Sequence, residues 1–340
     1  MTILYNLIIL ASIVFAVTFF LTYLFTFALV KTLPKRGSVA EDYHKLSRPK
    51  VAWPGGPAIF SSILIVELSL YLIYGDLRIL SIALVTMIAG VIGLIDDKWR
   101  LKNGIIKPVL LILASLPILL LDIYGEIYVP SPIFPIFGSV RLYYVYPILV
   151  LAAVSIVSNA TNMMDVLNGA LSGFMIIATI PLVFSLILRA DYNIMMATLP
   201  LIGSSLAFFI FHRYPSKIFP GDSGSLALGA MFCAIAIVGR VEVVAIVSIL
   251  PAILNSFFIL SSVKRLVEHR SIKTRPTILL PNGQLAASKE PSAPITLVRM
   301  ILAEGPLSEK DVVSNILKLS TFSAFLAVIT ALLTPWENLA

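Results

Sequence analysis

Cysteine, histidine and charge are all scarce in this chain of 340 residues. The single cysteine, Cys233, lies in an apolar stretch, which excludes a disulfide framework and a cysteine metal site. The three histidines, His44, His212 and His269, are too dispersed for their spacing to indicate a zinc site. Only 13% of the residues are charged and 59% are hydrophobic, which lies outside the range of soluble globular proteins. The composition therefore indicates a polytopic membrane protein.

Long apolar runs are abundant, and a helix that crosses a bilayer needs about 20 mainly apolar residues. By that measure the sequence predicts an all-α fold with ten spans, which form one integral membrane domain over residues 1–340. The predicted spans are 3–30, 57–74, 79–95, 106–121, 144–158, 170–188, 194–211, 225–239, 241–263 and 314–334. The first run is longer than the core of a signal peptide and has no basic segment before it, so we expect it to be retained as a helix.

The connections between spans alternate in charge. Most lysines and arginines fall in one set of connections, which comprises 31–56, 96–105, 159–169, 212–224 and 264–313. The opposite set holds only Arg78, Arg141, Arg189 and Arg240. By the positive-inside rule the first set is cytoplasmic and both termini lie outside. The net charge of +7 is explained by this bias. The expected partner is thus the lipid bilayer and not a nucleic acid.

Two connections are expected to contain small β-hairpins. The segment 122–143 is rich in proline and β-branched residues and favours a hairpin over the outer face. Asn282-Gly283, between two short apolar runs in the last long connection, indicates a hairpin with a type I′ turn.

Two adjacent aspartates, Asp96 and Asp97, end the apolar run 79–95. Like charges beside hydrocarbon repel each other and are poorly solvated, so we expect a cation or a phosphate-bound metal next to them. Lys107, about one turn inside the following span, is expected to point back to Asp97. Deep in the hydrocarbon the sequence places only Glu67 and Asn255. Because ion pathways usually need ionisable groups near mid-membrane, this distribution favours a substrate that arrives from the cytoplasm.

A polar stripe follows at a spacing of three residues and comprises Asn159, Asn162, Asp165 and Asn168. On a helix this spacing places the four side chains on one face. Amide and carboxylate oxygens suit magnesium, and amides also read the edge of a nucleobase. The alternative is a polar stripe that packs against neighbouring helices.

Asp222 lies in a Gly-Asp-Ser-Gly turn just before a predicted helix. Such a turn can present backbone amides to an anion while the carboxylate holds a cation. The alternative is an ordinary aspartate N-cap. Phe219, three residues earlier, is placed to stack on a base or to lie at the membrane edge.

Basic residues in the long connections, Lys45, His269, Arg270 and Arg275, have two interpretations. Each alone is an ordinary positive-inside charge. Together with the acidic residues and Lys107 they favour a pyrophosphate and metal site, because phosphoryl transfer spreads charge over non-bridging oxygens.

Four ordered motifs then carry a family resemblance: GLIDDKWR with the later Lys107, SNATNMMDVLNG, YPSKIFPGDSGSLALG and a basic HR…RP loop. From about Asp42 to the last helix the chain resembles the polyprenyl-phosphate N-acetylhexosamine-1-phosphate transferases. The resemblance implies transfer of a sugar-1-phosphate from a UDP-sugar to a polyprenyl or dolichyl phosphate, with release of UMP. It also implies magnesium, or manganese, as the cofactor and a homodimer as the assembly.

The resemblance assigns a role to each matching position. Asp222 and Asn162 look like metal ligands, with Asp165 beside them, and Asp96 and Asp97 look like the catalytic pair. One aspartate of the pair would lie near the lipid phosphate while the other supports the metal or Lys107. The remaining matches look like pyrophosphate, uracil and sugar-phosphate contacts and comprise Lys107, Lys45, Asn159, Asn168, Phe219, His269, Arg270 and Arg275.

The motifs resemble the archaeal and eukaryotic branch, which implies UDP-GlcNAc as donor and the first step of lipid-linked oligosaccharide synthesis for protein glycosylation. Asn168 stands where the peptidoglycan enzyme has aspartate, and the last long connection lacks that enzyme's histidine cluster. The implied location is the cell membrane of an archaeon, or the endoplasmic reticulum in a eukaryote, with the active site cytoplasmic.

Three other interpretations remain open at this point. One is a bacterial-type phospho-MurNAc-pentapeptide or undecaprenyl-phosphate sugar-phosphate transferase. A transporter or lipid flippase would need a mid-membrane site and matching broken helices in two repeats, and the sequence shows no repeat. An inactive scaffold is opposed by the four intact acidic positions.

Overall fold

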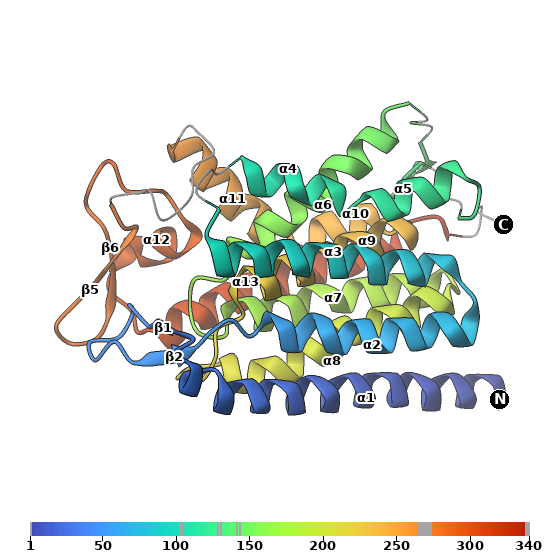
Figure 1. Cartoon of the computed structure of the whole chain (residues 1–340). Coiled ribbons are helices and arrows are strands. Elements are labelled where there is room, and N and C mark those ends of the chain that lie inside the picture. Colours follow the sequence, from blue (N-terminus) through green and yellow to red (C-terminus); the bar gives the residue numbers. More distant parts are fainter. Residues whose placement is uncertain are drawn as a thin grey trace.

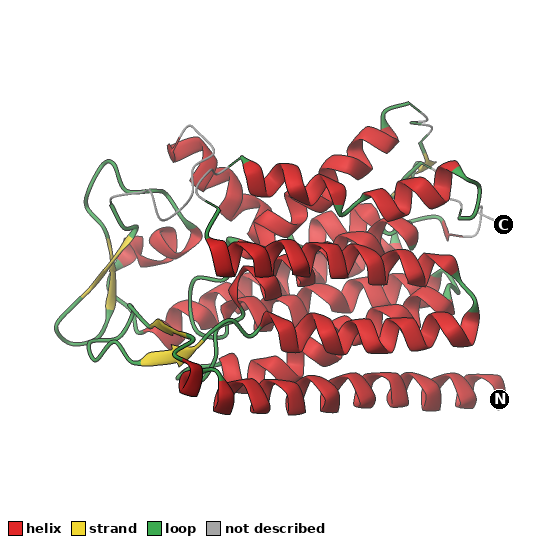
Figure 2. Ribbon diagram, viewed as in Figure 1, coloured by secondary structure: helices red, strands yellow, loops and turns green. Residues whose placement is uncertain are grey.

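The computed structural model describes residues 2–101, 105–127, 129, 131–140, 142, 144–263 and 274–336, and it consists mainly of helices (Figures 1 and 2). The helices are α1 (Thr2–Thr32), α2 (Gly56–Tyr74), α3 (Leu77–Trp99), α4 (Ile106–Leu113), α5 (Leu116–Ile123), α6 (Tyr146–Asn162), α7 (Ala170–Leu188), α8 (Tyr192–His212), α9 (Gly221–Val238), α10 (Glu242–Ser248), α11 (Leu250–Val263), α12 (Leu297–Ile301) and α13 (Glu309–Leu332). Three antiparallel pairs of short strands are β1 (Val39–Glu41) with β2 (Lys50–Ala52), β3 (Ile133–Phe134) with β4 (Gly138–Ser139), and β5 (Thr277–Leu279) with β6 (Leu285–Ala287).

The prediction of an all-α, multi-pass membrane fold is confirmed. Within the described residues, eight helical segments are long and apolar enough to cross a membrane, with α4 and α5 taken as one segment. The pair α10 and α11 is a ninth candidate, bent by 67°, and α6 is a shorter apolar helix. Each of the ten predicted spans therefore has a helical counterpart. The α4–α5 segment is interrupted at Ala114 and Ser115, just before Pro117 in the first turn of α5.

Two helices begin earlier than the hydrophobic runs predict. The prediction starts at residues 225 and 314, whereas α9 begins at Gly221 and α13 at Glu309. Their first turns contain charged and small polar residues, which a hydrophobicity criterion excludes. These polar first turns contribute Asp222 and Glu309 to the candidate site.

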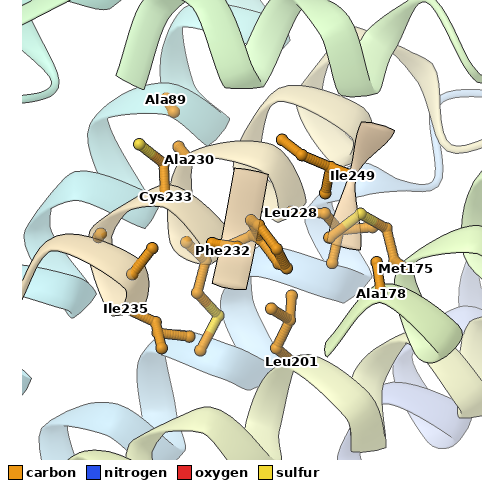
Figure 3. Packing of buried hydrophobic residues seen from close by; sticks show 14 of the residues in the cluster. Ala89, Met175, Ala178, Leu201, Leu228, Ala230, Phe232, Cys233, Ile235 and Ile249 are labelled. Carbon is orange, nitrogen blue, oxygen red and sulfur yellow. The ribbon is translucent and has the colours of Figure 1, made fainter. Parts of the chain in front are cut away.

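Helix α9 is the central element of the bundle, and 94% of its residues are buried. Its neighbours approach closely because glycines remove side chains at the contacts. A Cβ atom added at Gly93 of α3 would lie 2.4 Å from the carbonyl oxygen of Asp222, and one added at Gly56 of α2 would lie 2.2 Å from the amide nitrogen of Gly224. Further along α9, side chains such as Phe232 and Cys233 pack against α3, α7 and α8 in the apolar core (Figure 3).

The two ends of the bundle differ. We call the end with β1–β2, β5–β6 and α12 the loop end, and the end where α1 begins and α13 finishes the terminal end (Figure 1). The β3–β4 hairpin lies at the terminal end, where Ile136 donates a backbone hydrogen bond to Leu333. Which face of the membrane each end contacts stays a prediction.

Both expected hairpins are present, but the prediction of a type I′ turn is wrong. Gly283 has a φ of +81°, whereas Asn282 keeps a negative φ, and a type I′ turn needs positive φ at both residues. Gly283 donates to Leu280, and Leu280 donates to Gln284, so the loop has three residues with a glycine in the left-handed region.

Candidate active site

The first turn of α9 is capped from another helix. Asp222 is not the N-cap, because that position is Pro220, which has no side-chain oxygen. Instead the Asp97 carboxylate at the end of α3 accepts hydrogen bonds from the backbone amides of Asp222 and Ser223, at 2.9 and 3.0 Å. It also accepts one from the Ser223 hydroxyl at 2.6 Å. A negative charge at a helix N-terminus is favourable, so Asp97 fixes α9 against α3.

Lys107, at the start of α4, connects two other carboxylates. Its Nζ lies 2.8 Å from Oδ2 of Asp96 and 2.5 Å from Oδ2 of Asp222. The expectation that Lys107 points to Asp97 is therefore wrong. Asp96 and Asp97 are successive residues of a helix and point in different directions, and both oxygens of Asp97 are already used by α9. We refer to Asp96, Asp97, Lys107 and Asp222 as the carboxylate cluster.

The carboxylate cluster carries more negative than positive charge and is almost closed to solvent. Asp96 is 0% exposed, Asp97 4%, Lys107 6% and Asp222 8%. The excess negative charge affects the pKa of Asp165, which lies in the connection between α6 and α7. Burial raises the pKa of Asp165 well above its usual range, and the nearby charges of Asp222 and Asp97 raise it further. A site with surplus negative charge is prepared to receive a cation or cationic group.

Asn162, the last residue of α6, reaches the same turn of α9. Its Oδ1 accepts a hydrogen bond from the Ser225 hydroxyl at 2.7 Å, and that hydroxyl lies 3.0 Å from the carbonyl oxygen of Gly221. Asn162 and Asp222 thus present hard oxygen donors from adjacent helix ends, and such donors suit magnesium. Among the described residues no three His, Cys, Asp or Glu side chains form a ready-made metal site, so a metal would need ligands from substrate or water.

A second polar cluster forms around Asn168, near the end of the α6–α7 connection. The Asn168 side chain donates to Asp42 at 3.0 Å, and its backbone amide donates to Glu309 at 2.9 Å. Lys45 pairs with both acids, with Glu309 at 3.1 Å. We call these four residues the Asn168 cluster. It joins the first long connection, the predicted polar stripe and the start of α13, although the three are far apart in sequence.

Phe219 sits on a short backbone pairing beside the site. Its amide donates to the carbonyl of Ala52, and its carbonyl accepts from the amide of Gly55. The next carbonyl, that of Pro220, accepts from Gly56. The stretch from 52 to 56 therefore supports the turn that leads to Asp222. The Phe219 ring is half-buried three residues before the carboxylate cluster.

The structure separates the remaining predicted residues. Asn159 donates back to Ser155 of its own helix at 2.8 Å and joins neither cluster. Arg275 is exposed, with its guanidinium 4.5 Å from the ring centre of Tyr43. His269 and Arg270 lie outside the described residues.

Asn255 differs from the expectation that it lies deep in hydrocarbon, whereas Glu67 lies well inside a helix that is long enough to span a membrane. Asn255, in α11, donates to the carbonyl of Met163 at 2.9 Å and accepts from the amide of Leu297 at 2.8 Å. It therefore ties the α6–α7 connection to α12 at the loop end. Glu67 is fully buried in α2, and its carboxylate oxygens have no hydrogen-bond partner among the described residues.

Sequence reasoning missed several residues around the site. His212 is buried at the end of α8, where its ring contacts the Ser172 hydroxyl at 3.0 Å and Asp165 at 3.5 Å. Glu309 and Asp42 complete the Asn168 cluster, but Glu309 is separated from Lys45 by 264 residues, so no local spacing reveals the pair. Asp42 has a weak signal, because it precedes Lys45 by three residues in a conspicuously charged connection.

Comparison with known proteins gives a family model and three informative relatives. The model of glycosyl transferase family 4 matches residues 79–240. A Saccharolobus solfataricus protein with the provisional name UDP-N-acetylglucosamine–dolichyl-phosphate N-acetylglucosaminephosphotransferase is 26% identical over 318 residues, which is 92% of this chain and 94% of the relative. A provisionally named glycosyltransferase of Methanocaldococcus jannaschii is 28% identical over 320 residues, 92% of this chain and 95% of the relative. The phospho-N-acetylmuramoyl-pentapeptide-transferase of Halalkalibacterium halodurans is 30% identical over 256 residues, 70% of this chain and 75% of the relative.

Proposed function

Since the chain belongs to glycosyl transferase family 4, we propose that it transfers N-acetylglucosamine-1-phosphate from UDP-N-acetylglucosamine to a polyprenyl or dolichyl phosphate and releases UMP. The observation that carries this proposal is the carboxylate cluster, in which one buried lysine is held between Asp96 and Asp222. The name and the near-complete coverage of the Saccharolobus solfataricus relative support the choice of donor and acceptor. In this interpretation the loop end faces the cytoplasm, in agreement with its lysines and arginines.

The reaction is a displacement at phosphorus. An oxygen of the polyprenyl phosphate forms a bond to the β-phosphorus of the nucleotide sugar. The bond from that phosphorus to the oxygen bridging the two phosphates breaks, and UMP leaves with the electron pair. The product is a polyprenyl diphosphate sugar. No oxidant or reductant is needed, and the attacking phosphate oxygen needs no base when it is ionised.

The chain's own residues supply position and charge. Lys107 can exchange its contact with Asp222 for the pyrophosphate oxygens of the donor, because an ammonium is a mobile point charge on a flexible stem. Asp96 then retains Lys107 and directs it. Asp97 holds the first turn of α9, so the backbone amides there stay fixed. The half-buried ring of Phe219 offers a face on which uracil can stack, and Asn168 offers an amide for its edge.

Magnesium fits the donor set of this site. Asp222 and Asn162 would hold it, with Asp165 beside them. When bound, the ion neutralises charge on the pyrophosphate and on the departing UMP.

A donor screen with purified full-length protein tests the proposal. The protein is incubated with polyprenyl phosphate, magnesium and one of three donors: UDP-N-acetylglucosamine, UDP-N-acetylgalactosamine or UDP-N-acetylmuramoyl-pentapeptide. We expect UMP and lipid-linked product from the first donor. Turnover only with the pentapeptide donor would replace the proposal with the activity named for the Halalkalibacterium halodurans relative. Detergent removes sealed compartments, so UMP release under these conditions also excludes a transporter as the explanation.

The metal assignment needs its own variant. Asp222→Ala should abolish UMP release and also remove the magnesium-dependent rise in the midpoint of thermal unfolding that we expect for the parent protein. Ser216→Ala is a matched control, because Ser216 lies in the connection that leads to α9 and its hydroxyl donates to the carbonyl of Ile218. Turnover retained by Asp222→Ala would disprove its role as a metal ligand.

A further inference from the structure

A groove of about 550 Å³ lies between the loop ends of α8 and α13. It reaches the α6–α7 connection at Asn168, where Gly169 packs against the backbone of Arg213. Among the residues that line this groove, the proposed reaction uses only Asn168. The principal lining residues of the groove are Phe209, Arg213, Tyr214, Lys310, Leu317 and Lys318.

Three cations of the groove have no acidic partner among the described residues. Arg213, Lys310 and Lys318 are exposed and form no ion pair within the part of the chain that the structure describes. The Lys310 ammonium lies 4.9 Å from the ring centre of Tyr214, and that of Lys318 makes only a 3.5 Å contact with Asn315. Lys45 and Lys107 at the two site clusters and Arg78 at the terminal end have acidic partners, whereas this group is available to an anion.

The rest of the groove is mainly apolar, with Asn168, Ser314 and Thr321 as its uncharged polar residues, and it follows α8 and α13 away from the loop end. Phe209 lies one turn before the end of α8, and Val313 and Leu317 follow Lys310 at intervals of three or four residues along α13. Both helices are long and apolar enough to span a bilayer. The groove thus presents positive charge at the loop end and hydrocarbon-compatible surface further along α13.

We propose that this groove binds an anionic bilayer phospholipid, with its phosphate against Arg213, Lys310 and Lys318 and an acyl chain along Phe209 and Leu317. The three charges and the apolar side chains beside them favour a lipid over a soluble anion. Each basic residue near a membrane surface contributes about fivefold to affinity for anionic lipid. The lipid would lie against the back of the Asn168 cluster, since Lys310 follows Glu309 directly. This site is separate from the carboxylate cluster.

Lipid binding to the purified full-length protein can be measured by native mass spectrometry. The probes are phosphatidylglycerol and phosphatidylcholine with the same acyl chains, at equal concentration. We expect the parent protein to retain phosphatidylglycerol preferentially. The triple substitution Arg213→Gln, Lys310→Gln and Lys318→Gln should lower that preference by about 100-fold, the product of three fivefold contributions.

A matched control removes the same charge from the same end of the bundle. The triple substitution Lys31→Gln, Lys35→Gln and Arg36→Gln changes exposed residues at the loop end of α1 and should leave the preference within about twofold of the parent. A second variant, Ser314→Trp, fills the groove without changing its charge and should also displace the lipid. If the triple variant of the groove does not fold, Ser314→Trp still tests whether the lipid occupies the groove.

Three results would overturn the proposal. Equal losses in the two triple variants would show only nonspecific attraction to the basic end. Equal retention of the two phospholipids would show an apolar surface without headgroup recognition. Displacement of phosphatidylglycerol by inorganic phosphate or by an equal concentration of short-chain polyprenyl phosphate would assign the groove to a soluble anion or to the acceptor. None of these readouts requires sugar-phosphate transfer, so they are independent of the proposed function.

Discussion

Gly93→Ala should disable the site without touching any of its side chains. The added Cβ would lie 2.4 Å from the carbonyl oxygen of Asp222 and 2.6 Å from the Cα of Ser223, both backbone atoms of α9. Carbon atoms in contact need about 3.5 Å, so α3 and α9 must separate by about 1 Å. Such overpacking costs about 1–3 kcal/mol, and a misplacement of about 1 Å at a reacting centre costs about 100-fold in rate. We therefore expect a loss of about 100-fold in the rate of UMP release.

Gly90→Ala is the matched control on the same helix. Its added Cβ would lie 2.9 Å from the ring of Phe60, which is a side chain that can turn aside. We expect turnover within about threefold of the parent, because α9 is not displaced. The assay is UMP release by both variants at saturating donor, with circular dichroism to verify the fold. If a folded Gly93→Ala protein turned over as fast as Gly90→Ala, the close contact between α3 and α9 would not position the site.

Three further outcomes follow from contacts outside that interface. Asp97→Asn should abolish UMP release and lower the thermal midpoint, because an amide cannot accept the hydrogen bonds that both carboxylate oxygens receive. An unchanged midpoint with lost turnover would assign that carboxylate to the reaction itself. Single cysteines introduced at Ser139 and Asn282 can be labelled separately because Cys233 is buried. An impermeant maleimide should label Asn282→Cys only in inside-out vesicles. Labelling of Asn282→Cys in right-side-out vesicles would show that the loop end faces outside. Burial alone would raise the pKa of Asp76, but hydrogen bonds and charge from Arg78 outweigh burial and hold that pKa below its usual value. The Asp76 carboxylate therefore stabilises the fold at any pH above its pKa in the unfolded chain. That stabilisation is lost as the pH falls through its pKa in the folded protein. The thermal midpoint should therefore fall more steeply below about pH 4 in the parent than in Asp76→Asn, and equal slopes would contradict the linkage.

The helices were predictable because hydrophobic length is a local property of the sequence. The starts of α9 and α13 were not, since their first turns are polar and serve the site. Residue Asn282 shows a similar limit. The dipeptide predicts a hairpin correctly, but the turn type depends on the strand register, which places one residue more in the loop.

The sequence predicted which residues belong to the site better than it predicted which of them contact each other. The Asp96–Asp97 pair stands out in the sequence because two adjacent carboxylates at the end of an apolar run are poorly solvated, and Lys107 follows nearby. Which aspartate Lys107 meets depends on how α3 rotates against α9, and that rotation is set by glycine contacts between helices far apart in sequence. The partnership of Glu309 with Asn168 depends on tertiary packing in the same way.

The burial of α9 divides the site into parts of unequal mobility. Helix α9 is enclosed on all sides and capped by Asp97, so Asp222 belongs to the portion of the molecule that fluctuates least. Lys107 belongs to α4, a helix of eight residues with only two of them buried. Conformational exchange during each catalytic cycle should therefore be concentrated in α4, while the opposite wall keeps a constant shape and imposes stereochemistry on whatever binds between them.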